Sequence, residues 1–440
     1  MDIAVSMTII FFLLIFSIIN KIFIAWPLGG ALFILGILSL RRGHNLIDTI
    51  KMALAGGRKS FIVLQVFILI GILTSMWISA GTIPAIVYYG IRFINPSFFV
   101  ISAFIITSFV SFLLGTSLGT VSTMGVALIV MAKAGDINMA LVTGAIMSGA
   151  YFGDRCSPMS SSAILVANLT KTNIFDNIRD MFTTSRLPLV LSALLYLGFS
   201  LKNPIVFAGS SIGEDIYSVF HIGLISFLPA AIILIASLFK IRVKKSMTLS
   251  IIAAFFISVI IEGYSPMELL SFSFWGFQLE DGILPGNILN RGGVTSMLRA
   301  GVVVFISCAM AGIFNGTKML DRFHIIFRRA RDRFHLFTYT IITSILTSAF
   351  GCNQTIAIVL TEQLLEETYT DTAHSRRKLA IDLENTAVVI APLIPWNIAA
   401  FMPTSTLDVN FYTYVPYAFY LYLLPLVNLL ILKKNKNTAS

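Results

Sequence analysis

The stretch Gly149-Ala-Tyr-Phe-Gly-Asp-Arg-Cys-Ser-Pro-Met-Ser-Ser-Ser162 ends the apolar run Met139–Phe152 with glycine, a charged pair, proline and hydroxyls. The run has the composition of a membrane helix, but Pro158 removes a backbone donor and glycine loosens the helix. The freed carbonyl and amide groups cannot face lipid, so they must line protein or water. The stretch therefore predicts a broken or re-entrant helix inside a membrane protein.

The whole chain has the composition of a membrane protein. Of its 440 residues, 57% are hydrophobic and only 12% are charged, and the mean hydropathy is +0.88. A soluble domain has roughly 25% charged residues, which it needs to cover its surface, whereas lipid removes that need. We therefore expect an all-α polytopic membrane protein.

Apolar runs follow one another along the sequence. A spanning helix needs about 20 mostly apolar residues, and several runs are shorter than that. We estimate about 10 to 12 membrane segments, some of them broken or re-entrant. We expect an N-terminal helical hairpin with a basic loop, a first repeat, a connector with intervening helices, and a second repeat. These regions are predicted at residues 1–60, 61–201, 202–290 and 291–440.

The net charge of +10 comes from basic clusters between the apolar runs. A nucleic-acid binder would instead place basic stripes on a polar domain, so no nucleic-acid partner is expected. Under the positive-inside rule the clusters mark cytoplasmic loops of a multi-pass protein in the cell membrane. An initial helical hairpin then places the N-terminus in the cytoplasm as well. The clusters lie at residues 41–59, 240–245, 318–333, 376–378 and 433–436.

A second polar region repeats the plan of the first. In the first region Gly115 precedes Pro158 by 43 residues, and in the second, which begins at Phe350-Gly-Cys-Asn-Gln-Thr355, Gly351 precedes Pro392 by 41. Two halves with matching broken helices are the sequence sign of an inverted-repeat transporter. The predicted helix breaks are Gly115, Gly119, Pro158, Gly351, Pro392 and Pro395.

Oxygen-bearing side chains at these breaks are candidate ligands for an ion or a substrate. Freed carbonyls with Ser, Thr and Asn oxygens can replace water around Na⁺, and half-helix N-termini attract an anionic group. The alternative is that these small residues only pack helices together, as the GxxxG pairs Gly115/Gly119 and Gly149/Gly153 would. The predicted ion- or substrate-binding residues are Asp154, Ser157, Ser160, Ser161, Ser162, Asn353, Thr355, Glu384, Asn385, Thr386 and Asn397.

Three acids adjoin the predicted breaks. A charge inside the bilayer costs several kcal/mol, so it needs a partner or a function. Asp154, Asp382 and Glu384 are therefore predicted to couple proton movement or to help hold a cation. The alternative is that Arg155 pairs with Asp154, and that the basic cluster at 376–378 pairs with Asp382.

Enzyme chemistry is not expected. Gly115-Thr-Ser-Leu-Gly119 matches GxSxG, but that motif requires a strand–turn–helix context and a histidine partner. The three cysteines and five histidines show no metal-ligand spacing, so no cofactor or resident metal is predicted, only Na⁺ or H⁺ as coupling ions, with Na⁺ bound transiently. The expected partners are an ion or small-molecule substrate and the lipid bilayer, with a homodimer left open.

The motifs at these positions resemble those of the NhaC-type sodium/proton antiporter family. Gly153-Asp-Arg-Cys-Ser-Pro-Met-Ser160 is similar to the family's G-D-x-x-S-P-L-S, and Pro392-Leu-Ile-Pro-Trp-Asn397 matches P-L-I-P-W-N. Arg291-Gly-Gly-Val-Thr-Ser-Met297 looks like the family's R-G-G segment. The resemblance covers most of the chain and implies a cation-coupled secondary transporter with an elevator-like or rocking inverted repeat.

The chain departs from the family pattern at two acids. The family usually continues S-P-L-S with D-T-T, where this chain has Ser161-Ser162-Ala163, and it usually has E-D-S-G-T, where this chain has Glu384-Asn385-Thr386-Ala387-Val388. A serine or asparagine offers Na⁺ only a dipole, and fewer fixed negative charges repel a carboxylate less. The departures put plain Na⁺/H⁺ exchange in doubt.

The sequence supports two transporter hypotheses, and a third hypothesis comes from another functional class. The first is a Na⁺/H⁺ antiporter-like secondary transporter that moves a cation or small solute by alternating access. The second is a Na⁺- or H⁺-coupled amino-acid or carboxylate transporter on the same scaffold, such as a malate/lactate-type exchanger. The third is an intramembrane enzyme or passive channel; the acids and the broken helices disfavour a simple channel only weakly.

Overall fold

The computed structural model describes residues 2–20, 22–135, 137–205, 211–239, 241–279, 289, 292–317, 319, 332–370, 376–410 and 412–439. Within these ranges every regular element is a helix, which confirms the all-α prediction. Lys240, Arg291 and the arginines between 322 and 331, which belong to predicted loops and to the R-G-G segment, lie outside the described residues.

Seven helical segments of the described chain are long and apolar enough to cross a membrane. Two bent pairs, Gly213–Val219 with Leu224–Leu238 and Arg376–Leu393 with Ile398–Leu407, raise the number to nine. The prediction of 10 to 12 segments also counted apolar runs that form shorter helices in the described chain, Val5–Ile19, Ala25–Arg41 and Ser161–Thr170. The seven are α3 (Leu46–Ser79), η1 with α5 (Pro96–Leu114), α6 to α7 (Ser117–Ala134), α10 (Ile174–Lys202), α13 (Val243–Ile260), η5 with α15 (Val294–Gly316) and α17 (Arg333–Gly351).

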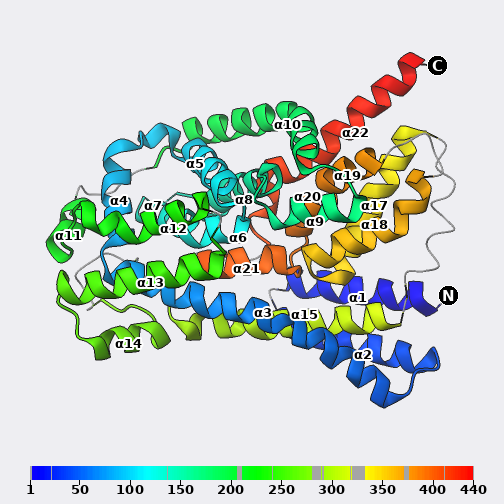
Figure 1. Ribbon diagram of the computed structural model, residues 1–440, viewed down its shortest axis with the longest axis horizontal. Coiled ribbons are helices and arrows are strands. Elements are labelled where there is room, and N and C mark those ends of the chain that lie inside the picture. The colour runs from blue at the N-terminus through cyan, green and yellow to red at the C-terminus, as the bar shows by residue number, and fades with distance from the viewer. Residues whose placement is uncertain are drawn as a thin grey trace.

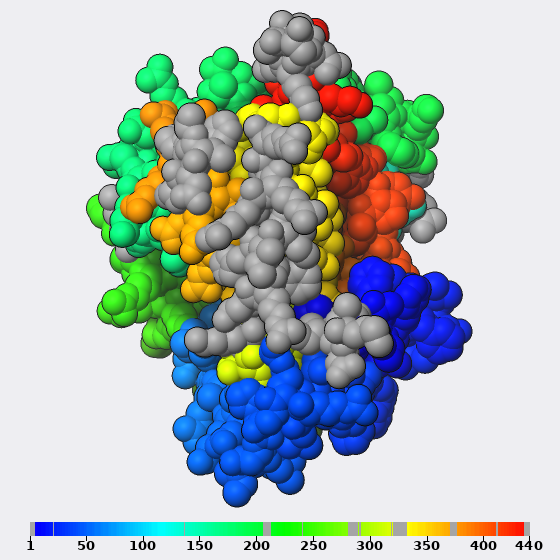
Figure 2. All heavy atoms as spheres, turned by 90° about the vertical axis from the view of Figure 1, so that its right-hand side faces the viewer, coloured from blue at the N-terminus to red at the C-terminus, as the bar shows by residue number. Residues whose placement is uncertain are grey.

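The helices form two layers around a buried centre (Figure 1). α3 and α15 pack along each other in one layer with α2, α13 and α14, while α10 packs with α5 and α22 in the other. Figure 2 shows the same order from the side, with the first helices at the bottom and α17 to α19 above them. The remaining bounds in these layers are α1 Asp2–Ile19, α2 Ala25–Arg41, α4 Thr82–Phe93, α11 Ser211–Val219, α12 Leu228–Leu238, α14 Pro266–Trp275 and α22 Phe419–Ala439.

The centre is occupied by α8 (Met139–Cys156), of which sixteen of eighteen residues are buried. It packs most extensively against α5, and both helices lack a solvent-facing polar side. Gly149 and Gly153 make this approach possible, since a Cβ on Gly153 would lie 2.4 Å from the backbone nitrogen of Phe112. These glycines therefore serve helix packing, which is the role that GxxxG pairs have between membrane helices.

The first half contains two chain breaks. α5 (Phe99–Leu114) ends at Gly115, whose φ of 63° is left-handed and whose Cβ position would lie 2.7 Å from the Met159 backbone. Only glycine satisfies both conditions. Gly119, expected at a break, lies inside α6 (Ser117–Thr120), and a π-helical turn η2 (Val121–Gly125) then leads into α7 (Val126–Ala134). The second break, residues 157–160, contains Pro158 and separates α8 from α9 (Ser161–Thr170).

The second half has the same order of elements. α17 ends at Gly351, where a break was expected, and the next residue, Cys352, takes the left-handed conformation with φ 52°. α18 (Gln354–Thr370) packs back on α17. α19 (Arg376–Asn385), α20 (Ala387–Ile390) and η7 (Ala391–Leu393) follow. Pro392 lies within η7, whereas Pro395 lies in the break before α21 (Ile398–Leu407). Across this break the two helical segments differ in direction by 51°.

The two helix pairs lie toward opposite ends of the molecule. α4 and α7 lie at the left end of Figure 1, whereas α17, α18 and both chain termini lie at the right. The α5/α6–α7 pair and the α17/α18 pair thus approach the centre from opposite ends, each followed by an interrupted helix. This is the arrangement that an inverted repeat predicts.

Small residues hold α3 against α15. A Cβ on Gly56 would lie 2.2 Å from the carbonyl oxygen of Cys308 and 2.6 Å from the Cα of Gly312. Backbone therefore touches backbone, which allows the close van der Waals packing on which membrane helices depend.

We expect Gly56→Ala to destabilise the protein, because the added methyl group can only be accommodated if the two backbones separate. Overpacking of this kind costs about 1–3 kcal/mol, which should appear as a lower midpoint of thermal unfolding in detergent. The matched control is Gly36→Ala in α2, where a Cβ would meet nothing within 4 Å. Equal midpoints for the two variants would contradict the packing described here.

Candidate functional site

Asp154 lies where the two breaks of the first half meet. It is 5% exposed, near the end of α8. The hydroxyl of Ser117, two residues after Gly115, donates to its Oδ2 at 3.1 Å, and the hydroxyl of Ser160 donates to its Oδ1 at 2.8 Å. A buried carboxylate is thus held by two neutral hydroxyls that come from two different breaks.

Ser160 also caps the N-terminus of α9. Its Oγ accepts the backbone N–H groups of Ser162 at 3.1 Å and Ala163 at 3.3 Å, which an isolated half-helix would leave unsatisfied. The Ser162 hydroxyl lies 2.8 Å from the Ser160 hydroxyl. Three of the predicted oxygens, those of Asp154, Ser160 and Ser162, are therefore connected in one cluster, and they could surround a small cation.

The other two serines of this motif lie apart from the Asp154 carboxylate. Ser157 is buried, and its Oγ accepts the N–H of Met159 at 3.2 Å within the break itself. Ser161 is exposed and lines a cavity of about 540 Å³ beside the break.

Arg155 is fully buried but does not pair with Asp154. Among the described residues, its guanidinium donates to the backbone oxygen of Glu384 at 3.0 Å, to the side-chain oxygen of Asn385, and to three hydroxyls. The alternative that Arg155 neutralises Asp154 is therefore wrong. The three hydroxyls are those of Thr184 and Ser185 in α10 and of Tyr420 in α22.

Glu384 is the least compensated group of the site. It is fully buried in α19, and neither carboxylate oxygen has a hydrogen-bond partner among the described residues. A buried carboxylate in this situation carries a large desolvation cost unless it is protonated or binds a cation. Glu384 is therefore a candidate for binding a proton or a cation.

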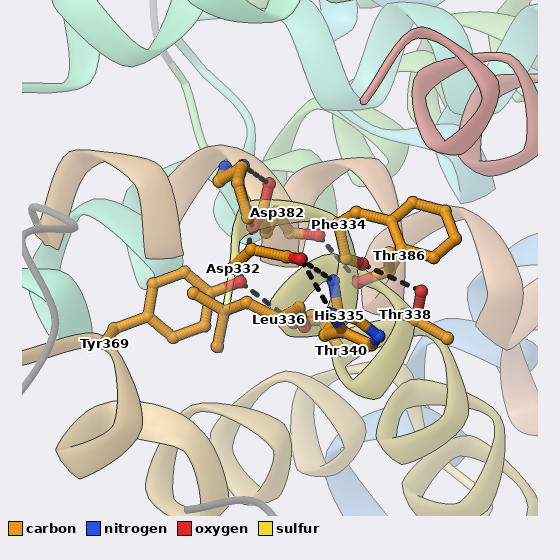
Figure 3. A network of polar contacts seen from close by, with 10 residues as sticks. Asp332, Phe334, His335, Leu336, Thr338, Thr340, Tyr369, Asp382 and Thr386 are labelled. Carbon is orange, nitrogen blue, oxygen red and sulfur yellow. Dashed lines mark hydrogen bonds and ion pairs between the residues drawn. The ribbon is translucent and has the colours of Figure 1, made fainter. Parts of the chain in front are cut away.

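Asp382 has a different environment, which Figure 3 shows from close by. Arg333, at the start of α17, forms a two-pronged ion pair with both carboxylate oxygens, and the hydroxyl of Tyr369 donates to Oδ2. Tyr369 in turn lies 2.9 Å from the Thr340 hydroxyl. The predicted partner cluster at 376–378 does not make this ion pair; the Arg377 guanidinium binds Asp180 instead.

The other predicted binding residues of the second half lie in two separate regions, the buried centre and a second cavity. Asn385 contacts Arg155, Thr386 accepts from Ser344 at 2.9 Å, and Asn397 donates to the Ser348 carbonyl at 2.8 Å while its Oδ1 accepts the N–H of Ala399. These three are buried near the centre. Asn353 and Thr355 instead line a second cavity, of about 890 Å³, between α3, α15 and α18.

Two contributors were not among the residues predicted for the site. Ser117 lies in the polar stretch after Gly115, but its contact with Asp154 joins residues 37 apart and needs the fold. Tyr151 precedes Asp154 by three residues, so both side chains lie on one face of α8, and its hydroxyl donates to the Ala399 carbonyl at 2.8 Å. Tyr151 thereby connects α8 to α21, the half-helix after the second break.

Residues 149–433 match the Na⁺/H⁺ antiporter family, a range that includes the breaks at Pro158 and Pro395 and the α17/α18 pair. Curated relatives align over most of their length. The malate-2H⁺/Na⁺-lactate antiporter of Bacillus subtilis is 28% identical over 411 residues, which cover 90% of this chain and 85% of that protein.

Two further relatives differ in their named solutes. The Na⁺/H⁺ antiporter NhaC of Alkalihalophilus pseudofirmus is 28% identical over 407 residues, which cover 89% of this chain and 85% of the relative. The arginine/ornithine antiporter ArcD of Halobacterium salinarum is 26% identical over 383 residues, which cover 85% and 78%. Similar chains are thus named for transport of metal cations, organic acids and amino acids.

We expect Asp382→Asn to lower stability, because it leaves the guanidinium of Arg333 partly buried without its countercharge. Removing one partner of a buried pair costs about 3–5 kcal/mol, so the unfolding midpoint in detergent should fall by several degrees. The double variant Asp382→Asn/Arg333→Gln should recover part of that loss, because neither charge is then left alone. An unchanged midpoint together with lost transport would instead make Asp382 a coupling residue.

Proposed function

The chain belongs to the Na⁺/H⁺ antiporter family, and on that basis we propose that its two buried acids, Asp154 and Glu384, bind and release the coupling cation. It is a multi-pass membrane transporter and a secondary antiporter, not an enzyme. The observation that carries the proposal is that both acids lie buried at the helix breaks without a basic partner among the described ion pairs.

Asp154 and Glu384 have different surroundings, and we infer that they bind different coupling ions. Asp154 has the hydroxyl oxygens of Ser117, Ser160 and Ser162 in its cluster, the kind of neutral oxygen set that can coordinate Na⁺. Glu384 has no such oxygens within hydrogen-bonding distance. We therefore assign Asp154 to Na⁺ or H⁺, and Glu384 to H⁺.

Arg155 is a positioning residue in this proposal. It joins the end of α8 to the Glu384 backbone, to α10 and to α22, so that the segments bearing both acids are held together. Asp382, whose carboxylate is occupied by Arg333 and Tyr369, is assigned a structural role.

The helix breaks support transport by alternating access. The two cavities lie at the tips of the two helix pairs: one borders Gly115 and faces α12 and α13, and the other borders Asn353 and faces α3 and α15. Movement of the paired helices relative to these outer helices would change the exposure of the tips. This fits an elevator-like or rocking motion of the two repeats.

We propose that the N-terminus and C-terminus both face the cytoplasm. They lie at the same end of the molecule in Figure 1, and basic residues are concentrated in cytoplasmic loops. A protease-cleavable tag added at the N-terminus should be cut in inside-out vesicles and protected in intact spheroplasts. The reverse protection pattern would contradict this orientation.

We expect Asp154→Asn and Glu384→Gln each to abolish cation-coupled proton movement, because each removes a group that exchanges charge. The measurement uses purified protein in liposomes that contain a pH-sensitive dye, with a Na⁺ gradient imposed. The reduction should exceed tenfold, while the unfolding midpoint stays close to that of the unaltered protein.

The matched control is Glu214→Gln, which removes an exposed acid in α11 and should leave the flux unchanged. Persistent proton flux in Asp154→Asn would remove that residue from the coupling site. Loss of flux in all three variants would point to a general effect on folding or reconstitution.

A further inference from the structure

The cavity of about 540 Å³ beside the first-half breaks has features that the cation site does not explain. It opens between the first helix pair and the outer helices α12 and α13. Its walls include both breaks of the first half, at Gly115–Thr116 and at Pro158–Ser161. Its volume is within the range of small-molecule binding sites.

The charge of the cavity wall is positive. Among the described residues that line it, Arg242, exposed at the start of α13, is the one ionisable residue, and none carries a carboxylate. The Arg242 backbone is fixed at this position, because its carbonyl accepts the N–H groups of Lys245 at 2.8 Å and Ser246 at 3.1 Å. A guanidinium presents a planar set of donors that matches a carboxylate.

Neutral donors from the two breaks also line the cavity. Thr116 and Ser161 both line the cavity, and Ser161 is the first residue of α9, a ten-residue helix whose N-terminal end favours negative charge. The rest of the wall is mostly apolar, with Ile164, Ile233 and Met247 among its members. One end of a ligand would therefore meet hydrogen-bond donors, and its carbon skeleton would meet aliphatic side chains.

The cavity is lined by sequence neighbours of the residues that hold the proposed coupling acid. Thr116 precedes Ser117, and Ser161 follows Ser160; Ser117 and Ser160 are the two residues whose hydroxyls hold Asp154. A ligand that contacts Thr116 and Ser161 would thus touch the chain segments whose next residues, Ser117 and Ser160, hold the Asp154 carboxylate. An anion there is repelled by an ionised Asp154 and tolerated once that acid has bound H⁺ or Na⁺.

We infer that this cavity binds the carboxylate group of a small organic anion, held by Arg242, Thr116 and Ser161, and that the anion binds together with the cation on Asp154. This inference rests on the proposed coupling role of Asp154. It names a substrate class and a site: the protein exchanges a cation-accompanied carboxylate for a second solute.

Few ionisable groups can affect the pH dependence of carboxylate binding. Around Asp154, the ionisable side chains that interact with it are Tyr151 on the same helix and Glu384 on α19, with Arg155 adjacent in sequence. The elements that form its other walls, α5, α6 and α9, contain no ionisable side chain. Carboxylate affinity should therefore increase as pH falls, and this dependence should require Asp154.

The test uses the full chain in liposomes with labelled lactate, malate and arginine as probes, under an imposed pH gradient and then a Na⁺ gradient. We expect saturable uptake of a carboxylate. Arg242→Gln should raise its KM about tenfold, equivalent to about 1.4 kcal/mol, with little change in kcat. Arg242→Lys should retain most of the affinity. Lys245→Gln, which changes an exposed cation in the same helix outside the cavity, should leave the KM unchanged.

The outcomes separate this inference from the proposed function. Asp154-dependent proton flux without carboxylate uptake would overturn the inference and leave the coupling role intact, as would uptake of arginine alone. Carboxylate uptake with the same KM in Arg242→Gln would overturn the assigned site. Arg242-dependent uptake that keeps its pH dependence in Asp154→Asn would support the cavity and overturn the coupling role of Asp154.

Discussion

The structure depends on one constraint: backbone groups freed at a helix break inside a membrane must find partners within the protein. At the first-half break, Ser160 accepts two N–H groups of α9 with the same oxygen that donates its hydrogen to Asp154. In the second half, Asn397 accepts the N–H of Ala399 and donates to the Ser348 carbonyl. The side chains that make the breaks tolerable are thus also the ones that hold the centre in place. The same side chains therefore satisfy the backbone groups at the breaks and form the polar centre.

Buried charge is distributed unequally around this centre. Arg155 and the Arg333–Asp382 pair have their hydrogen-bonding groups occupied by protein, which fixes the helices that meet there. The hydrogen bonds to the Asp154 carboxylate come from neutral donors, and neither carboxylate oxygen of Glu384 has a hydrogen-bond partner among the described residues. A charged group with a complete set of partners gains little from binding an ion, whereas an incompletely compensated acid gains much. This contrast, and not burial, which all three acids share, is the basis for proposing Asp154 and Glu384 as coupling acids and Asp382 as a structural one.

Much of this arrangement could be predicted from the sequence, but only where the cause was local. Pro158 and the serines around it predicted a break, and the polar stretch at Gly115 predicted another, because backbone chemistry acts within a few residues. The Arg333 partner of Asp382 was not anticipated, since it lies 49 residues away and the alternative to a coupling role named only the basic cluster at 376–378. Asn353 and Thr355 have suitable oxygens and the right spacing, yet the fold directs them to a different cavity. Which candidates meet is decided by packing over long sequence separations.

The charges at the centre also explain why neutral residues at two positions are compatible with transport. Arg155 contributes one positive charge, and Asp154 and Glu384 contribute two negative ones, so a single bound cation brings the three groups to neutrality. The resemblance to the NhaC-type pattern implies acids where this chain has Ser161 and Asn385. Here Asn385 accepts from Arg155 with an amide oxygen, which satisfies the guanidinium without adding a negative charge. With both acids present, further cations would be needed before the centre could cross a low-dielectric barrier. Their absence lowers the number of cations required and leaves the wall at Ser161 able to accept an anion.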